Sequence, residues 1–246
     1  MNRFYHPSPL ELKQKIHLSS EVAHHAIHVL RLRTDDKIIL FHNDLYDYSA
    51  VINQINKKTV EVYIDSKFEN QKNPIIHLRL FQSLSSSEKM DWIIQKSVEL
   101  GVSSIIPMYS KRSNIKFQDS RAKKKLSHWQ QVIVSACEQS GRSSLPKIFL
   151  PRKIEECLNQ GNEENVNNLK LILSPKEKNT LQSINNPSIK NIDIMIGPEG
   201  GFTEEEINQA IKLNFVPIGL GPRILRTETA PLSILSILQY KYGDFA

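Results

Sequence analysis

Apolar and polar residues alternate over short stretches in the first part of the chain, a pattern typical of β-strands. The clearest alternation covers residues 59–64, and apolar runs at 37–42 and 48–52 predict two further strands. Two serines precede residues 21–31 and can cap a short helix there. These elements together predict a small β-rich barrel.

A different pattern begins after a polar stretch at residues 69–74, which is the best candidate for a linker. A strand-like run at 76–81 is followed by an amphipathic helix at 87–100, which Gly101 ends. Helix-like sequence lies near each of the further predicted strands, at 104–108, 147–150, 169–173, 192–196 and 215–220. This alternation predicts an α/β fold, a parallel sheet covered by helices on both faces.

The chain is therefore divided into three parts. Residues 1–70 form the barrel, 71–75 the linker and 76–246 the α/β domain. A length of 246 residues suits two such units, and 39% hydrophobic with 24% charged residues is ordinary globular composition. No apolar run approaches the roughly 18 residues of a membrane span, and the N-terminus lacks the apolar stretch of a secretion signal. We expect a soluble, cytoplasmic protein with no membrane partner.

The two cysteines, Cys137 and Cys157, form no CxxC motif, and no histidine has the spacing of a zinc ligand. We expect both to be small buried hydrophobes, with neither a disulfide framework nor a metal site. The histidines at 24, 25 and 28 lack further ligands nearby, so we interpret them as surface or groove residues.

The net charge of +6 is concentrated in the middle of the chain. Residues 71–152 contain fourteen basic and five acidic side chains, and seven basic residues with one acidic residue fall in the stretch 111–125. Such a cluster attracts a polyanion and neutralises phosphates. On charge alone, a solvated lysine-rich helix face explains the stretch equally well.

Five of the nine glycines fall within 25 residues, in two loops that each follow a predicted strand. Open α/β sheets bind their ligands at this end of the strands. In the first loop, Thr203 can cap a helix that begins with Glu204, Glu205 and Glu206. These acids disfavour a phosphate there, and the motifs GxxxxGK[ST] and GxGxxG are absent, which weakens a nucleoside triphosphate or dinucleotide hypothesis.

The second loop, residues 220–231, leads into an apolar helix at 232–240. Prolines 198 and 222 stiffen the two loops, which suits a small ligand held by main-chain groups, with Ile224 and Leu225 beside a flat ring. Two tight structural turns are the alternative.

The strings GPEGGF at 197–202 and LGPRILRTETA at 220–230 resemble the cofactor-binding signature of the RsmE family, SPOUT-superfamily methyltransferases of small-subunit ribosomal RNA. The resemblance extends over nearly the whole chain, through Arg3-Phe4 and the segments 28–31, 88–92, 99–102, 112–113 and 138–142.

This resemblance implies an N-terminal PUA-like β-barrel for RNA and a C-terminal SPOUT domain with a deep trefoil knot. The implied reaction transfers the methyl group of S-adenosylmethionine to N3 of one uridine in the 16S rRNA of the small ribosomal subunit. The family acts as a homodimer.

We expect three groups of site residues, of which the resemblance, carried over by position, implies the first. The cofactor pocket takes Leu173, Ile196, Gly197, Gly200, Leu220, Ile224 and Leu225, and Thr227 is either a further pocket hydroxyl or a cap of the last helix. Arg226 is the expected stabiliser of a uracil anion, and Glu199 the candidate base, although an acid in such a loop more often holds the loop together. The expected RNA contacts are Arg3, Arg31, Arg33, Lys111, Arg112, Lys124 and Arg142.

Two other classes of protein compete with this interpretation. A non-catalytic RNA-binding ribosome-assembly factor could use the same basic surface, and binding of S-adenosylmethionine measured by calorimetry discriminates against it. A nicotinamide-dependent oxidoreductase is disfavoured by the missing dinucleotide fingerprint.

Overall fold

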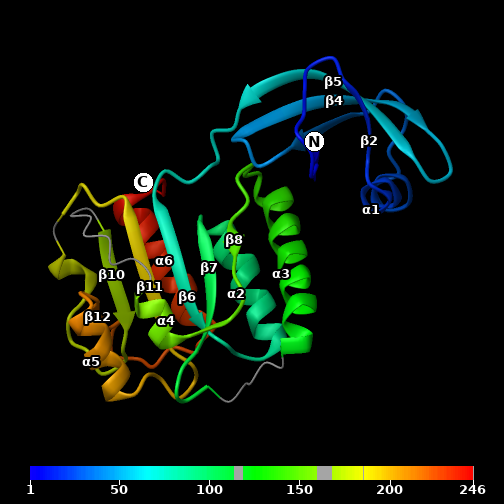
Figure 1. Cartoon of the computed structure of the whole chain (residues 1–246). Helices are drawn as coiled ribbons and strands as arrows, with labels where there is room; N and C mark the ends of the chain where they lie inside the picture. The colour runs from blue at the N-terminus through cyan, green and yellow to red at the C-terminus, as the bar shows by residue number, and fades with distance from the viewer. Residues whose placement is uncertain (114–118, 160–167, 185, 246) are drawn as a thin grey trace. The chain divides into compact units, whose positions relative to one another are not determined.

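The structure, a computed structural model, describes residues 1–113, 119–159, 168–184 and 186–245, and Figure 1 shows the course of the chain. Residues 1–73 and 137–145 form unit 1, and residues 74–136 and 146–246 form unit 2. No pattern in the sequence indicates that residues 137–145 belong to unit 1. Tertiary hydrogen bonds place them there, since Asn70 Nδ2 donates to the Gly141 carbonyl at 2.8 Å.

Unit 1 is built on a five-stranded sheet with the order β1-β3-β4-β5-β2. Its strands are β1 (Asn2–Tyr5), β2 (Lys15–His17), β3 (Lys37–Phe41), β4 (Tyr46–Ile55) and β5 (Val60–Glu69). The β1–β3 pair is parallel and the other pairs are antiparallel. The sequence predicts β3, β4 and β5 but misses the two edge strands, which are too short to show a clear alternation.

The helix predicted at 21–31 is shorter in the structure than expected, and it has an α-helical and a π-helical part. Helix α1 (Ser20–His24) continues into a π-helical turn at His25–Val29. The expected cap is confirmed, because Ser19 Oγ accepts a hydrogen bond from the Val22 N–H at 3.3 Å. The core of unit 1 includes the fully buried side chains of Ile38, Leu40, Ile52, Val62 and Ile64.

The seven strands in the described part of unit 2 pair in parallel, as the alternating pattern predicts. They are β6 (His77–Ser83), β7 (Ser104–Tyr109), β8 (Lys147–Ile148), β9 (Arg152–Lys153), β10 (Asn168–Leu173), β11 (Asn191–Ile196) and β12 (Val216–Ile218). The sheet order is β12-β10-β11-β6-β7-β8, and β9 also pairs with β7.

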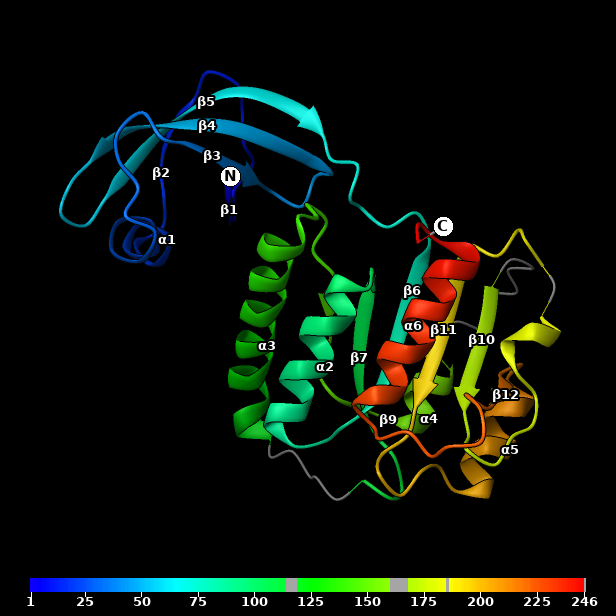
Figure 2. The ribbon, with the colours of Figure 1, turned by 180° about the vertical axis from the view of Figure 1, so that it is seen from behind.

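Helices cover both faces of this sheet, as Figures 1 and 2 show from opposite sides. Helices α2 (Ser87–Glu99) and α6 (Thr229–Tyr242) pack together on one face, and α4 (Ile154–Asn159) and α5 (Glu204–Lys212) on the other. Helix α3 spans Asp119–Ser140, and a 3-10 turn covers Leu181–Ser183. Among the described helices, none has the length and apolarity needed to cross a bilayer.

The order of the strands forces the chain to cross its own path. Strand β11 lies between β10 and β6, whereas β12 lies beyond β10. The segment after β12 must therefore return past β10 and β11 to reach α6, which packs on α2. This crossing brings the loop after β11 and the loop after β12 to the same edge of the sheet, and it agrees with the knotted arrangement that the resemblance implies.

Cys137 and Cys157 are buried, as expected from the sequence. Burial raises the pKa of each thiol to about 12. Both thiols therefore stay protonated at neutral pH and act as small apolar side chains.

The end of α6 is fixed by a close fit around Gln239. This side chain is 1% exposed, and its Nε2 donates to the Leu100 carbonyl at 3.0 Å. Gly101 ends α2 with φ +81°, and a Cβ on it would lie 2.1 Å from Gln239 Nε2. An alanine at position 101 would therefore both strain the backbone and displace the buried amide.

We expect Gly101→Ala to lower the free energy of unfolding by about 2–4 kcal/mol, measured by urea denaturation. Gly201→Ala is the matched control, because Gly201 has φ +66° but a Cβ on it meets no atom within 4 Å. The control should lose only the free energy that corresponds to backbone strain at positive φ, about 1–2 kcal/mol. Equal losses in the two variants would contradict the role of Gln239.

Candidate active site

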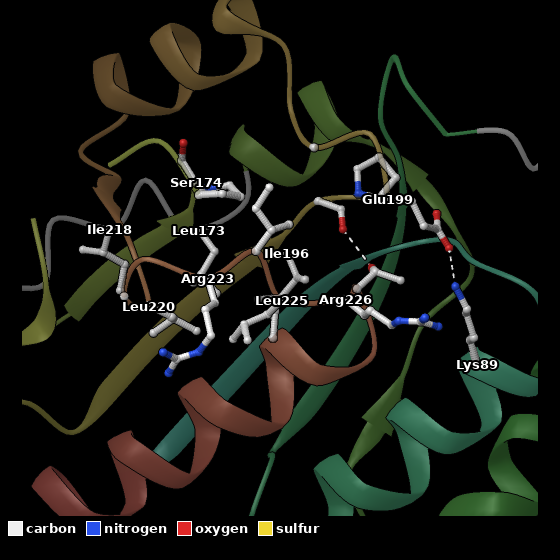
Figure 3. A pocket seen from close by; sticks show the side chains of 18 residues that line it. Lys89, Leu173, Ser174, Ile196, Glu199, Ile218, Leu220, Arg223, Leu225 and Arg226 are labelled. Atoms are coloured by element: carbon white, nitrogen blue, oxygen red, sulfur yellow. Dashed lines mark hydrogen bonds and ion pairs between the residues drawn. The ribbon is translucent and has the colours of Figure 1, made fainter. Parts of the chain in front are cut away.

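A cavity of about 310 Å³ opens at the carboxyl edge of the parallel sheet of unit 2. Figure 3 shows the side chains that line it. Most of them come from the ends of β10, β11 and β12, from the loop after β11, called here loop A (residues 197–203), and from the loop after β12, called loop B (residues 219–228). Helices α2 and α6 add Lys89 and Ala230. Its walls are mostly aliphatic, with charged groups at one end, a composition typical of small-molecule sites.

Loop A is held by the capping arrangement that the sequence predicts. The Thr203 hydroxyl accepts the Glu206 N–H at 3.2 Å, and the Glu206 carboxylate accepts the Thr203 N–H at 2.7 Å. Loop B leaves β12 at Gly219, where a Cβ would lie 2.3 Å from the Glu177 carbonyl oxygen. Only glycine permits this close approach of the two backbones.

A buried hydrogen-bonded link joins the two loops. Thr227 Oγ1 in loop B donates to the Gly197 carbonyl in loop A at 2.9 Å, and Gln82 Nε2 on β6 donates to Thr227 Oγ1 at 3.3 Å. Gln82 is fully buried and Thr227 is 5% exposed. The Thr227 hydroxyl therefore uses its proton in the hydrogen bond to loop A. Thr227 lines the cavity as part of this link.

The charged end of the cavity contains two carboxylates bound by one lysine. Lys89 Nζ, on α2, lies 2.9 Å from Glu199 Oε1 in loop A and 3.5 Å from Glu228 Oε2 in loop B. Ser85 Oγ also donates to Glu199 Oε1, at 2.8 Å. Arg226 extends beside this cluster (Figure 3), with 82% of its side chain exposed and Nη1 4.0 Å from Glu228 Oε1.

The protonation states of this cluster follow from its contacts. Burial favours a higher pKa for Glu199, but hydrogen bonds from Lys89, its own backbone N–H and Ser85 outweigh burial, so the pKa lies below its ordinary value. The same hydrogen bond to Glu199 raises the pKa of Lys89. Glu199 is therefore a bound anion and a weak proton acceptor at neutral pH. This geometry favours the structural alternative for Glu199 over the role of a base.

Most of the expected cofactor residues come together here. Leu173, Ile196, Gly197, Leu220, Ile224, Leu225 and Thr227 all line the cavity. Gly200 is not among the lining residues. A Cβ added to Gly200 would lie 3.4 Å from the Cβ of Arg112, so this position faces Arg112. Ile224 is 84% exposed and belongs to the rim of the cavity.

Sequence reasoning missed Lys89, Gln82 and Ser85 as parts of this site. Lys89 lies on an amphipathic helix, where pairing with neighbours on the same helix is the default expectation. Only the tertiary fold brings it to loops A and B. Ser174, Ile218 and Arg223 also line the cavity and were missed. Their positions at strand ends or beside the second motif are the signals that could have found them.

Two of the expected RNA contacts are internal to unit 1. Arg142 is 4% exposed, and its Nε donates to the Ser144 carbonyl at 2.8 Å. Arg3 forms an ion pair with Asp47, which is 5% exposed, and donates to the Arg142 carbonyl at 3.4 Å. These engaged guanidinium groups do not offer a free surface charge, so we remove both from the RNA-facing set.

The remaining basic candidates differ in whether their side chains are exposed or already engaged in internal contacts. Arg31, Arg33 and Lys124 are exposed. Lys111 forms an ion pair with Glu205 at the start of α5, and Arg112 Nη1 donates to the Gly200 carbonyl of loop A at 2.8 Å, so both are engaged in internal contacts. Within the basic stretch 111–125, residues 114–118 lie outside the described residues, as do the side chains of 119–121.

Comparison with known proteins matches both units. A family model described as an RNA methyltransferase domain matches residues 71–239, and one described as an RNA methyltransferase PUA domain matches residues 18–65. The fold and the cavity thus define a class of protein, the RNA methyltransferases with an N-terminal PUA domain.

Relatives in this class are similar over their full length. The ribosomal RNA small subunit methyltransferase E of Buchnera aphidicola subsp. Schizaphis graminum is 38% identical, with 99% of this chain and 98% of the relative covered. That of Bacillus subtilis is 32% identical, covering 91% and 89%. The crystal structure of the Neisseria gonorrhoeae enzyme bound to S-adenosyl methionine is 37% identical, with both chains fully covered and a TM-score of 0.92.

A Legionella pneumophila methyltransferase, solved in complex with the bound cofactor SAM, is 36% identical with a TM-score of 0.91, and 99% of this chain and 98% of that chain are covered. This chain belongs to the ribosomal RNA small subunit methyltransferase E family. The family and the fold class expected from the two glycine motifs are confirmed.

The Lys89 cluster predicts a pH-dependent contribution to stability. Because the pKa of Glu199 lies below its ordinary value of 4.5, the carboxylate stabilises the folded state above pH 4.5, and this contribution is lost as the pH falls through the lowered pKa. We expect Lys89→Met to raise the pKa of Glu199, measured by carboxyl carbon NMR titration. The variant should also be less stable than the parent at pH 7, with a smaller difference well below pH 4.5.

Lys96→Met is the control, because Lys96 pairs with Glu99 on its own helix. It should leave the titration of Glu199 unchanged. An unchanged Glu199 pKa in Lys89→Met would remove Lys89 as the group that holds this carboxylate.

Proposed function

We propose that this protein is an S-adenosylmethionine-dependent methyltransferase that methylates N3 of one uridine in the 16S rRNA of the small ribosomal subunit. The observation that carries the proposal is the cavity formed by loops A and B at the carboxyl edge of the sheet. The relatives named above, two of them solved with this cofactor, support it. The activity belongs to the cytoplasm, where ribosomal subunits of bacteria are found.

The residues of the cavity fit the proposed cofactor. Leu173, Ile196 and Leu220 provide apolar walls for a flat ring, and the main-chain groups of the two glycine loops can read its polar edge. The cavity volume of about 310 Å³ suits a ligand that is only partly enclosed. When bound, S-adenosylmethionine supplies a methyl group already activated by its sulfonium.

The remaining task of the protein is to align the uridine and stabilise charge at its base. N3 of uracil carries a proton that must pass to solvent water for the methyl group to bond there, so negative charge develops on the ring oxygens. We assign Arg226 to stabilising this charge, because its guanidinium is exposed at the cavity and can donate to a carbonyl oxygen. Lys89 contacts both Glu199 and Glu228. Arg226, 4.0 Å from Glu228, keeps 82% of its side chain exposed and available to the substrate.

For RNA we propose a division of labour between the units. Arg31 and Arg33 in unit 1 and Lys124 on α3 are exposed cations that can contact phosphates. The match of residues 18–65 to an RNA methyltransferase PUA domain supports a role for unit 1 in RNA binding.

The reaction is tested by mass mapping of modified nucleosides in 16S rRNA incubated with the protein and S-adenosylmethionine. We expect one N3-methyluridine per rRNA. Methylation at another atom or another base would overturn the assignment. Absence of S-adenosylmethionine binding by calorimetry would instead favour the alternative, a non-catalytic RNA-binding ribosome-assembly factor.

Arg226→Ala should slow single-turnover methyl transfer by about 10²–10³-fold, the typical loss for one donor to a developing anion. The affinities for cofactor and rRNA should change little. Arg31→Ala is the contrasting variant, which should weaken rRNA binding and leave the single-turnover rate intact. If Arg226→Ala loses only affinity, or Arg31→Ala loses only rate, the assigned roles are reversed.

We further propose a homodimer that pairs through α6 and α2. Ile237 and Tyr240 on α6 are 42% and 70% exposed, and Trp92 on α2 is 50% exposed, whereas Ser233 and Ser236 allow close approach of another helix. We expect a dimeric mass by sedimentation across the micromolar range.

Ile237→Glu should shift this dimer to monomer, because it places a charge in the proposed apolar contact. Ile211→Glu is the matched control, since Ile211 is 46% exposed on α5, on the opposite face of the sheet. A monomeric parent protein, or loss of the dimer in both variants, would contradict this interface.

A further inference from the structure

A second recess lies at the same edge of the sheet as the cavity. It has a volume of about 450 Å³ and lies between the loop after β7 and the segment that contains β9. Strands β7 and β9 pair in parallel through Met108 with Arg152 and Tyr109 with Lys153, so both walls are at the carboxyl end of β7. The recess is lined by Tyr109, Ser110, Lys111, Ser113, Pro151, Arg152, Lys153 and Glu156.

Two cations of this recess have no anionic partner within the described part of the chain. Lys153 has no ion pair there, and the guanidinium carbon of Arg152 lies 5.3 Å from the centroid of the Phe149 ring. A cation–π contact of this kind occupies no N–H group with an anion, so the guanidinium can still donate to a ligand. Lys111 is already paired with Glu205, and Glu156 is the one acid that lines the recess.

The acids near the recess lie in the first turns of helices. Glu155 and Glu156 lie in the first turn of α4, where the helix N-terminus favours negative charge. Glu205 lies in the first turn of α5 and pairs with Lys111. Arg152 and Lys153 therefore give the recess a net positive charge.

A chain of hydroxyl groups ends at the recess. Ser83 Oγ donates to Ser110 Oγ at 3.4 Å, and Ser110 Oγ lies 2.9 Å from Ser113 Oγ. Ser113 Oγ also accepts the Ser110 N–H at 3.1 Å. With Ser110 donating along this chain, Ser113 Oγ accepts two hydrogen bonds, and its own proton is left to donate to a ligand.

The wall that contains Ser113 is bonded to loop A. The Lys111 N–H donates to Glu206 Oε1 at 2.8 Å, and Arg112 Nη1 donates to the Gly200 carbonyl at 2.8 Å. Loop A lines the cavity proposed for the cofactor, so the recess and that cavity flank one connected wall. A chain molecule whose base enters the cavity can lie along this wall.

We propose that the recess binds a backbone phosphodiester of the RNA beside the target uridine. Arg152 and Lys153 supply charge and donors, and Ser113 supplies a hydroxyl donor, the set of groups that phosphate oxygens accept from. This assignment rests on the proposed function, because it takes RNA as the substrate. It adds to that function a place where the polynucleotide is held.

The test compares two double variants in which glutamine keeps the length of the side chain. Arg152→Gln/Lys153→Gln removes the charge of the recess. Lys147→Gln/Lys190→Gln removes two exposed charges at the amino ends of β8 and β11, the opposite edge of the sheet. Binding of 16S rRNA is measured by filter retention at several salt concentrations, and thermal unfolding verifies that each variant folds.

We expect the recess variant to bind 16S rRNA about tenfold more weakly, with the slope of log K against log salt reduced by about 1, as for one lost phosphate contact. Ser113→Ala should weaken binding in the same direction without changing the slope. Cofactor affinity should be unchanged. The control variant should keep the salt slope of the parent.

Equal salt slopes in the recess variant and the parent would overturn the proposal, and so would an equal loss in the control variant. The binding measurement does not depend on methyl transfer. The proposed reaction and the proposed phosphodiester site can therefore be refuted independently. A parent protein that binds rRNA but forms no methyluridine refutes the proposed reaction, whereas the comparison of slopes still decides the recess.

Discussion

The site depends on one constraint, the return of the chain from the edge strand β12 across β10 and β11 to α6. The returning segment is loop B, and it is fixed against loop A by the buried link from Gln82 through Thr227 to the Gly197 carbonyl. Buried polar groups are costly unless they are hydrogen-bonded, so this link favours a single arrangement of the two loops. The cavity between them is therefore formed before any ligand arrives.

Charge balance at the mouth of the cavity follows from the same arrangement. Loops A and B each bring a carboxylate, Glu199 and Glu228, and α2 brings Lys89 between them. Two unpaired carboxylates would repel each other, and Lys89 contacts both. Arg226 adds a second positive charge 4.0 Å from Glu228 Oε1, yet 82% of its side chain stays exposed at the cavity. The lysine thus stabilises the two loops, and Arg226 remains accessible for the role assigned to it in the reaction.

The sequence predicted the type and order of most elements. The alternation at 59–64, the amphipathic helix ended by Gly101 and the capping box at Thr203 all reappear in the structure. These signals are local, because hydrophobic period and helix caps depend on neighbouring residues. The sequence analysis missed the edge strands β1 and β2, the π-helical turn, and the packing of residues 137–145 in unit 1. Each of these depends on partners far away along the chain.

For the site, the sequence by itself determined the two glycine loops, the aliphatic walls and the family, because these lie in continuous motifs. Only the tertiary structure decided which charged side chains are exposed and which are engaged in internal contacts. It buried Arg142, paired Arg3 with Asp47, turned Gly200 toward Arg112 and brought Lys89 from a distant helix to Glu199. The physical reason is that the availability of a charge depends on its partners and its burial, and residues far apart in sequence provide both.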